Sequence, residues 1–243
     1  LIGGIVRAYG TNAHSGKGPH YVVEADESDK SFTYLNPAAV LITNVEADHL
    51  DHYKDLSEIR GKFSEFISSV PRDGVAVVCG DDPSLVALAR KACHHVMTYG
   101  FSEGCDARVV SYAPHGVGST FTLMLPSGQT VGSSILQNPG RHNVLNGAGV
   151  LALLDALGYD AQVAAASLAT FKGVHRRFDL VGKAAGVTVV DDYAHHPTEI
   201  AATIAAAHEL DFKRVVVLFQ PHRYSRVTLF TEVLKDQFER AFD

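Results

Sequence analysis

The sequence predicts an α/β protein: a parallel sheet covered by helices, extended by a small antiparallel meander and followed by a second strand–helix unit. Its 243 residues suit one or two domains. Apolar residues make up 46% and charged residues 20%, which suits a buried core and disfavours disorder. Short β-branched runs alternate with segments of helical spacing, which is the pattern of parallel βαβ units.

The first part of the chain holds the predicted parallel strands. The run at 38–43, Ala-Ala-Val-Leu-Ile-Thr, is continuously apolar, as strands covered on both faces are. Helices are predicted between the strands, one with Ser57 as its N-cap and one with Pro83 at its first position. The predicted strands are 21–23, 38–43, 74–78 and 96–99, and the predicted helices are 57–69 and 82–92.

The middle of the chain changes character at about residue 105. Three segments rich in Thr, Val and Phe, separated by short turns that contain Gly, predict an antiparallel meander. They are residues 107–113, 119–125 and 130–134, and helices follow at 143–157 and 160–170.

After a break at 172–179 the alternation of strands and helices restarts. The strands are expected at 187–190 and 214–219, and the helices at 198–209 and from 227. We therefore expect two domains, residues 1–177 and residues 178–243.

Charge and composition exclude several classes of protein. The 21 Lys and Arg residues against 27 Asp and Glu give a net charge of −6, which disfavours a nucleic-acid binder. No apolar run reaches the roughly 18–20 residues that span a bilayer, so no membrane insertion is expected. The three cysteines form no CxxC or zinc pattern, which favours a reducing, cytoplasmic setting. The chain begins at Leu1 and stops within a helical pattern, so we expect a piece of a longer protein.

Two acidic segments follow predicted strands, at the edge where open α/β sheets bind ligands. The segment from Glu24 to Asp29 holds four carboxylates, which repel one another unless a cation compensates. The segment from Asn44 to His52 adds carboxylates and imidazoles. Alone, the first is more often a solvated loop, and the second suits a helix N-terminus. Together, the two segments are explained about equally well by a shared site for a divalent cation and by these structural roles. Oxygen-rich ligands with one imidazole favour Mg²⁺ or Mn²⁺ over structural zinc.

Later motifs carry polar side chains that suit a ligand, and each has a plain structural alternative. Asn143 and Asn146 lie on one helix face and match an adenine edge, or they form an N-cap and an exposed residue. The pair Arg176 and Arg177 suits phosphate oxygens, or it forms an interdomain salt bridge.

The last two motifs also follow predicted strands. Asp192 could hold ribose hydroxyls, and His195 could bind a substrate or cap the next helix, where Thr198 is itself a good N-cap. Arg223 and Arg226 could clamp one carboxylate, or they belong to a solvated basic turn.

The order of these motifs is more specific than any one of them. Through EADESDKSF, LITNVEADHLDHY, NPGRHNVLNGAGV, FKGVHRRFD, VVDDYAHHPTEI and LFQPHRYSR, the sequence resembles the Mur ligases from about residue 2 to 240. The resemblance implies the later part of a central ATP-binding domain and the first third of a Rossmann-like domain that binds an amino acid. The family's GTHGKT-type phosphate loop and its UDP-sugar domain have no counterpart here, so the fragment alone is expected to be inactive.

The resemblance also implies roles for single residues. In it, Glu24 and His49 are catalytic Mg²⁺ ligands, Arg177 faces the nucleotide phosphates, and His195 lies near the amino-acid substrate. The remaining matches are Asn143 and Asn146 near the nucleotide base, Asp192 on the ATP ribose, and Arg223 and Arg226 at the substrate carboxylate. Lys62 lies near a lysine that some family members carbamylate, but no modification is inferred.

The implied activity is ATP-dependent, ADP-forming ligation of L-alanine to UDP-N-acetylmuramate through an acyl phosphate, in bacterial peptidoglycan synthesis. EADES followed by NVEADHLDHY favours this activity over that of the relative that recycles murein tripeptide. The residues alone leave two further classes open. A metal-dependent hydrolase would turn over without ATP, and a non-catalytic metal-binding module would not turn over at all.

Overall fold

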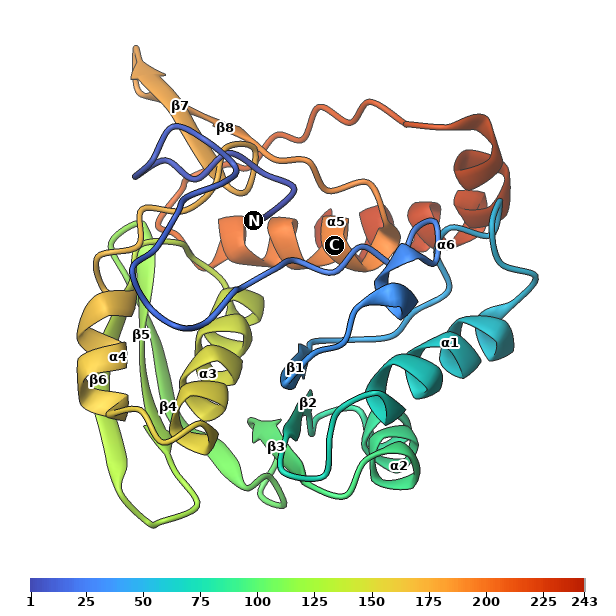
Figure 1. Cartoon of the computed structure of the whole chain (residues 1–243). Helices are drawn as coiled ribbons and strands as arrows, with labels where there is room; N and C mark the ends of the chain where they lie inside the picture. The colour runs from blue at the N-terminus through green and yellow to red at the C-terminus, as the bar shows by residue number, and fades with distance from the viewer. Residues whose placement is uncertain (243) are drawn as a thin grey trace.

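A six-stranded sheet forms the centre of the molecule, with the strands in the order β1-β2-β3-β4-β5-β6 (Figure 1). The computed structural model describes residues 1–242, and for residues 133–135, 225, 229, 241 and 242 it describes the backbone alone. Strands β1 (Ala39–Ile42), β2 (Val75–Cys79) and β3 (Val96–Gly100) run parallel. The predicted α/β class with a mostly parallel sheet is confirmed.

Helices α1 (Leu56–Ser68) and α2 (Pro83–Ala92) connect the parallel strands. Helix α2 begins as predicted, because the Asp82 carboxylate accepts the N–H groups of Ser84 and Leu85. The predicted N-cap Ser57 is wrong for α1. Its N-cap is Asp55, whose carboxylate accepts the N–H of Glu58 at 2.9 Å, so the helix begins earlier.

The predicted meander continues the same sheet. Strand β4 (Ala107–His115) pairs parallel with β3, and β5 (Gly118–Met124) and β6 (Thr130–Leu136) follow antiparallel. Helix α3 (Arg141–Ala156) lies close against the sheet at Gly149, and α4 (Ala161–Leu168) follows it. A Cβ at Gly149 would come within 2.8 Å of the Tyr99 ring, so a glycine is required for this close approach.

The C-terminal part has a different sheet from the one expected. Strand β8 (Val187–Asp191) forms an antiparallel hairpin with β7 (Asp179–Ala184), a strand that the pattern did not predict. Helices α5 (Pro197–His208) and α6 (Tyr224–Phe242) follow, and they pack around a small cluster of Ile200, Ile204 and Leu234. The N-cap of α5 is His196 in a capping box with Glu199, not Thr198.

Two predicted strands do not form. Residues 21–23 and 214–219 have no regular secondary structure, and within residues 1–242 neither segment pairs with a neighbouring strand. A β-branched run becomes a strand only where another backbone satisfies its N–H and C=O groups. Val22 is accordingly 75% exposed and Leu218 is 99% exposed.

Helix α5 lies across the N-terminal end of α3 and joins the C-terminal part to the sheet (Figure 1). A Cβ at Gly140, the N-cap of α3, would come within 2.8 Å of Ala206 on α5. Beyond the end of α5, Glu209 accepts a hydrogen bond from the Tyr112 hydroxyl on β4. No helix among those described combines the length and hydropathy needed to cross a membrane.

We expect Asp82→Ala to lower the free energy of unfolding by about 1 kcal/mol at neutral pH, because it removes the N-cap of α2. Burial raises the pKa of Asp82, but hydrogen bonds from Ser84 and Leu85 outweigh it and hold the pKa below its usual 3.8. A lowered native pKa stabilises the fold above pH 3.8, and this contribution disappears as the pH falls through the native pKa. The difference from wild type should therefore shrink below pH 3.8 in urea unfolding.

Asp82→Asn is the matched control, because asparagine caps a helix about as well as aspartate. A loss in Asp82→Asn as large as in Asp82→Ala would contradict the capping explanation.

Candidate functional site

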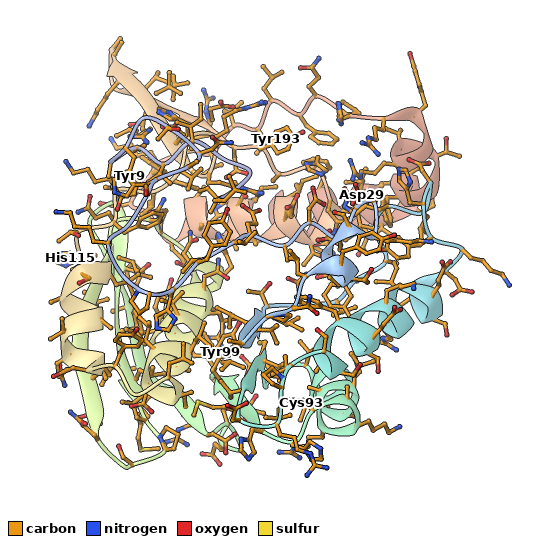
Figure 2. The ribbon with its side chains drawn as sticks, viewed as in Figure 1. Tyr9, Asp29, Cys93, Tyr99, His115 and Tyr193 are labelled. Carbon is orange, nitrogen blue, oxygen red and sulfur yellow. The ribbon has the colours of Figure 1, made fainter. Side chains whose placement is uncertain are left out.

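The two acidic segments meet beside the carboxyl end of β1. Tyr53, which closes the segment after β1, is buried, and its hydroxyl donates to the backbone carbonyl of Glu27. Lys30 lies over the Tyr53 ring at 4.8 Å. Figure 2 labels Asp29, which precedes the short 3-10 helix η1 (Ser31–Tyr34) in the first segment. The prediction that the two segments share one edge is thus supported by a direct contact.

His49 lies at the centre of this contact. Its Nε2 lies 3.1 Å from Glu27 Oε1 and 3.6 Å from Asp48 Oδ2. The hydrogen bond that His49 donates to the Glu27 carboxylate raises the pKa of His49, and the charge of Asp48 adds to this rise. The residue has a left-handed φ of 54°, and its Nδ1 is buried without a hydrogen-bond partner among residues 1–242. This combination of strain and an unpaired polar atom is typical of functional positions.

Glu24, the other predicted metal ligand, is engaged elsewhere. Its carboxylate accepts the N–H of Gly3 at 2.7 Å, and the side chain is exposed. No interaction within the described chain joins it to His49. Glu27 occupies the position beside His49 that we assigned to Glu24, and the joint ligation by Glu24 and His49 stays a prediction.

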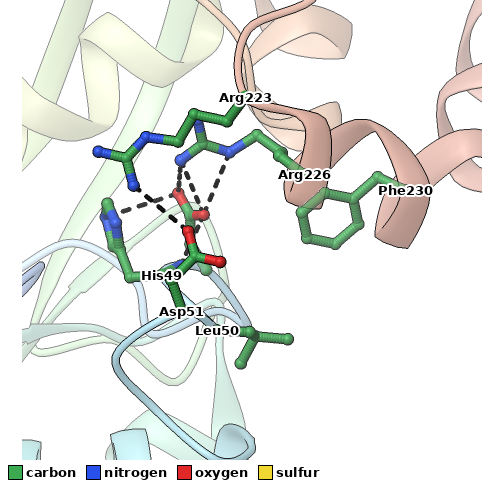
Figure 3. Close-up of a pocket in the computed structure, with 7 residues that line it drawn as sticks. His49, Leu50, Asp51, Arg223, Arg226 and Phe230 are labelled. Carbon is green, nitrogen blue, oxygen red and sulfur yellow. Dashed lines mark hydrogen bonds and ion pairs between the residues drawn. The ribbon is translucent and has the colours of Figure 1, made fainter.

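His49 also lines a cavity of about 220 Å³ (Figure 3). Asp48, Asp51 and Leu50 line it from the segment after β1, and Arg223, Arg226 and Phe230 line it from the start of α6. The predicted arginine pair is therefore brought beside the predicted metal segment, although the two are far apart in the sequence.

Each arginine of the cavity pairs with an aspartate. Arg226 donates hydrogen bonds from Nη2 to both carboxylate oxygens of Asp48, at 2.9 and 3.1 Å. The side chain of Arg226 is 8% exposed. Burial raises the pKa of Asp48, but hydrogen bonds from the His49 N–H and from Arg226 outweigh it and lower the pKa. Arg223 has a left-handed φ of 64° and lies 3.5 Å from Asp51.

The start of α5 also contacts the segment after β1. The Thr198 hydroxyl donates to Glu46 at 2.6 Å, and His196 Nδ1 lies 3.6 Å from the same carboxylate. The His196 ring meets Phe230 edge-on at 5.0 Å. The segment after β1 is thus held from both C-terminal helices.

The loop that carries Arg177 is shaped by two carboxylates. Its neighbours Arg176 and Phe178 have left-handed φ angles of 62° and 46°. Asp179, which is buried and paired with Arg7, accepts the Arg176 N–H, and Asp192 accepts the N–H groups of Phe178 and Ala194 at 2.7 Å. Asp192, the predicted ribose ligand, therefore holds the loop that carries Arg177 with one oxygen and the backbone of Ala194 with the other.

Glu199 connects two predicted site residues. Its Oε1 lies 3.4 Å from Arg177 Nη1, and its Oε2 accepts the backbone N–H of His195 at 3.1 Å. His195 also places its Nδ1 2.7 Å from the carbonyl of Tyr193, which is labelled in Figure 2.

The predicted asparagine pair lies at the start of α3, as expected. Asn146 is exposed, whereas the amide of Asn143 donates to the Pro139 carbonyl at 2.7 Å. His142 directly precedes Asn143, and burial lowers the pKa of its imidazole. No hydrogen bond or ion pair among the described residues joins either asparagine to a residue of the cavity.

The residues around His49 fit a hard cation in chemical type but form no closed cage. One imidazole and the carboxylates of Glu27 and Asp48 are the oxygen-rich set that Mg²⁺ takes. Within residues 1–242, no group of three or more His, Cys, Asp or Glu side chains is arranged to hold a metal ion. Mg²⁺ commonly takes only one or two protein carboxylates and completes its shell with phosphate and water.

The comparisons with known proteins give the chain a family. The profile described as "Mur ligase middle domain" matches residues 11–154, and the profile "Mur ligase, glutamate ligase domain" matches residues 176–242. The chain belongs to the Mur ligase family. The resemblance inferred from the ordered motifs is confirmed.

Among curated relatives, the UDP-N-acetylmuramate–L-alanine ligase of Thermobifida fusca is 47% identical over 96% of this chain and 51% of its own length. That of Xylella fastidiosa strain M12 is 44% identical over 98% of this chain and 50% of its own length. The chain thus spans about half the length of the curated relatives it matches.

Solved structures agree with this assignment. The UDP-N-acetylmuramate–alanine ligase of Thermotoga maritima superposes with a TM-score of 0.77 at 28% identity, covering 99% of this chain and 58% of that one. A tripeptide-adding Mur ligase of Neisseria, described as MPL, gives a TM-score of 0.59 at 28% identity over 72% of this chain and 58% of that one.

The sequence did not single out the carboxylates that pair with the predicted site residues. Glu27 and Asp48 stood within quoted motifs, but nothing in the sequence singles out which acid of a cluster faces His49 or Arg226. Glu199 was visible only as a residue after a possible N-cap. The Glu three positions after His196 has the spacing of a capping box, and this signal could have found it.

We expect a double-mutant cycle on Asp48 and Arg226 to give a coupling energy of about 1–3 kcal/mol in urea unfolding, because the pair is bidentate and mostly buried. The control cycle uses Asp236 and Arg240, which lie 3.0 Å apart on the exposed face of α6. It should give less than about 0.5 kcal/mol. Equal couplings in the two cycles would show that burial adds nothing to the Asp48–Arg226 pair.

Proposed function

We propose that this chain is part of a ligase that joins L-alanine to the carboxylate of UDP-N-acetylmuramate, with ATP converted to ADP and phosphate. The observation that carries the proposal is the match over nearly the whole chain to ligases of that name, at 44–47% identity. Because the chain spans about half of those relatives, the activity belongs to the longer protein and the fragment alone is expected to be inactive.

The cavity beside His49 supports an amino acid as one substrate. An amino acid is a small zwitterion, and this cavity of about 220 Å³ offers guanidinium groups and carboxylates within one space. Arg223 and Arg226 would bind the carboxylate of alanine through charge-assisted hydrogen bonds, and so form an arginine clamp. The apolar side chains of Leu50 and Phe230 would lie against its methyl group.

The nucleotide would bind between the loop that carries Arg177 and the start of helix α3. Arg177 is half exposed, and among the side chains that the structure describes its guanidinium pairs with Glu199 at 3.4 Å, so its remaining N–H groups can donate to phosphate oxygens. Asn143 and Asn146 would meet the base, and Asp192 the ribose. Mg²⁺, held by His49 with Glu24 or Glu27, would neutralise phosphate charge when bound.

The chemistry follows from the poor reactivity of a carboxylate. Transfer of the γ-phosphoryl group of ATP converts the muramate carboxylate to an acyl phosphate, whose phosphate is a good leaving group. The amino group of alanine then attacks the acyl carbon through a tetrahedral intermediate. This chain's residues bring two anions together by supplying cationic groups, and they orient the amino acid.

We propose that residues 1–177 belong to the nucleotide-binding domain and residues 178–243 to the amino-acid-binding domain, and that the enzyme acts in the bacterial cytoplasm during cell-wall synthesis. Recycling of murein tripeptide is less well supported, because the tripeptide-adding relative superposes over less of the chain.

The first test of the function is ADP release by the full-length protein. We expect ADP and product only when UDP-N-acetylmuramate and L-alanine are both present. ADP release with the murein tripeptide but not with L-alanine would favour the recycling activity, and turnover without ATP would favour a hydrolase.

We expect Arg223→Ala to raise the KM for L-alanine by about tenfold or more, because it removes a charge-assisted hydrogen bond to the carboxylate. The KM for ATP should stay within about twofold. Arg240→Ala, on the exposed face of α6, is the control and should change neither value. An unchanged KM for L-alanine in Arg223→Ala would reject the arginine clamp.

A further inference from the structure

Glu199 and His195 form an arrangement whose chemistry goes beyond binding. Nδ1 of His195 lies 2.7 Å from the Tyr193 carbonyl, and a carbonyl oxygen can only accept a hydrogen bond. The proton of the neutral imidazole therefore sits on Nδ1. Nε2 is left with its lone pair, and no residue that the structure describes donates a hydrogen bond to it.

Glu199 fixes this ring from the first turn of α5. Its Oε2 accepts the backbone N–H groups of His195 and His196 at 3.1 and 3.2 Å, and it lies 3.7 Å from His195 Nδ1. Burial raises the pKa of Glu199, but the hydrogen bond from the His195 N–H and nearby positive charge outweigh it, so the pKa is lowered. The carboxylate is therefore charged at neutral pH beside the His195 ring.

The ring also lies near the proposed amino-acid cavity. His195 and His222 are 6.4 Å apart between ring centres, and His222 directly precedes Arg223, which lines the cavity. The neighbouring His196 contacts Phe230 of the same cavity. His195 thus lies next to residues that adjoin the wall of the cavity formed by the start of α6.

The ligation step needs a proton acceptor at this place. L-alanine enters with an ammonium group, whose nitrogen has no lone pair to attack with. We infer that His195 Nε2 takes this proton, and that Glu199 is the positioning residue that holds His195 in the required tautomer and orientation. This inference rests on the proposed function and adds a step to it.

The step balances as follows. One proton passes from the ammonium group to His195 Nε2, which gives an imidazolium and a neutral amine. The amine lone pair forms the C–N bond with the acyl carbon, and the C–O bond to the phosphate breaks. Phosphate leaves with that electron pair and takes the second amine proton, while the imidazolium later returns its proton to water.

The experiment compares two nucleophiles in the full-length ligase. L-alanine needs the proton acceptor, whereas hydroxylamine is unprotonated at neutral pH and attacks the same acyl phosphate to give a hydroxamate. We expect His195→Gln to slow amide formation by about 10²-fold or more and to leave hydroxamate formation within about twofold. Glu199→Gln should slow amide formation about tenfold and also spare the hydroxamate.

Stability controls separate this role from helix capping. Glutamine at the third helix position keeps the capping box, so Glu199→Gln should melt like wild type. Glu199→Ala loses both cap and charge. Asp82→Ala loses the cap of α2 alone and should melt lower without any change in either reaction.

A pH profile gives the second readout. The charged and titratable groups around His195 are Glu199, Tyr193 and His222, with Arg177 reached through Glu199. Amide formation by His195→Gln should recover as the pH approaches the pKa of the alanine amine, because free amine then needs no acceptor.

Equal loss of both reactions, or no recovery at high pH, would overturn the inference, as would full amide formation by His195→Gln. If wild-type protein joins neither nucleophile and releases no ADP, the proposed function fails instead.

Discussion

The ion pair between Arg226 and Asp48 is the contact on which the arrangement of the candidate site depends. It joins residues 178 positions apart and draws the first turn of α6 onto the segment after β1. Both side chains are largely removed from water, so neither charge is stable there without the other. The pair thereby creates a cavity in which opposite charges lie side by side, which is the environment that an amino acid requires.

Carboxylates have two different uses around this site. Asp179 and Asp192 accept the backbone N–H groups of Arg176 and Phe178, which adopt left-handed conformations. Glu199 accepts the backbone N–H groups of His195 and His196. Asp48 and Glu27 instead face cationic side chains. A residue can do both, because a carboxylate oxygen has more than one lone pair. Asp192 can therefore shape its loop and still meet a ribose hydroxyl.

The sequence predicted the features that depend on local pattern. Continuous apolar runs identified β1 to β3, and Asp82-Pro83 identified the start of α2. Both signals are local, because an apolar run and a helix cap are each visible in a few neighbouring residues. Residues 21–23 and 214–219 failed as strands because strand formation depends on a partner that the local pattern does not specify. The choice of Glu27 over Glu24 beside His49 likewise depends on how Tyr53 anchors the loop.

The most direct test of the account is a crystal structure of the full-length ligase with UDP-N-acetylmuramate, a non-hydrolysable ATP analogue and L-alanine. We expect L-alanine to lie between Leu50 and Phe230, with its carboxylate on Arg223 or Arg226 and its amino group towards His195. L-alanine bound outside this cavity, with Arg226 and Asp48 still closed on each other and Arg223 in solvent, would contradict it.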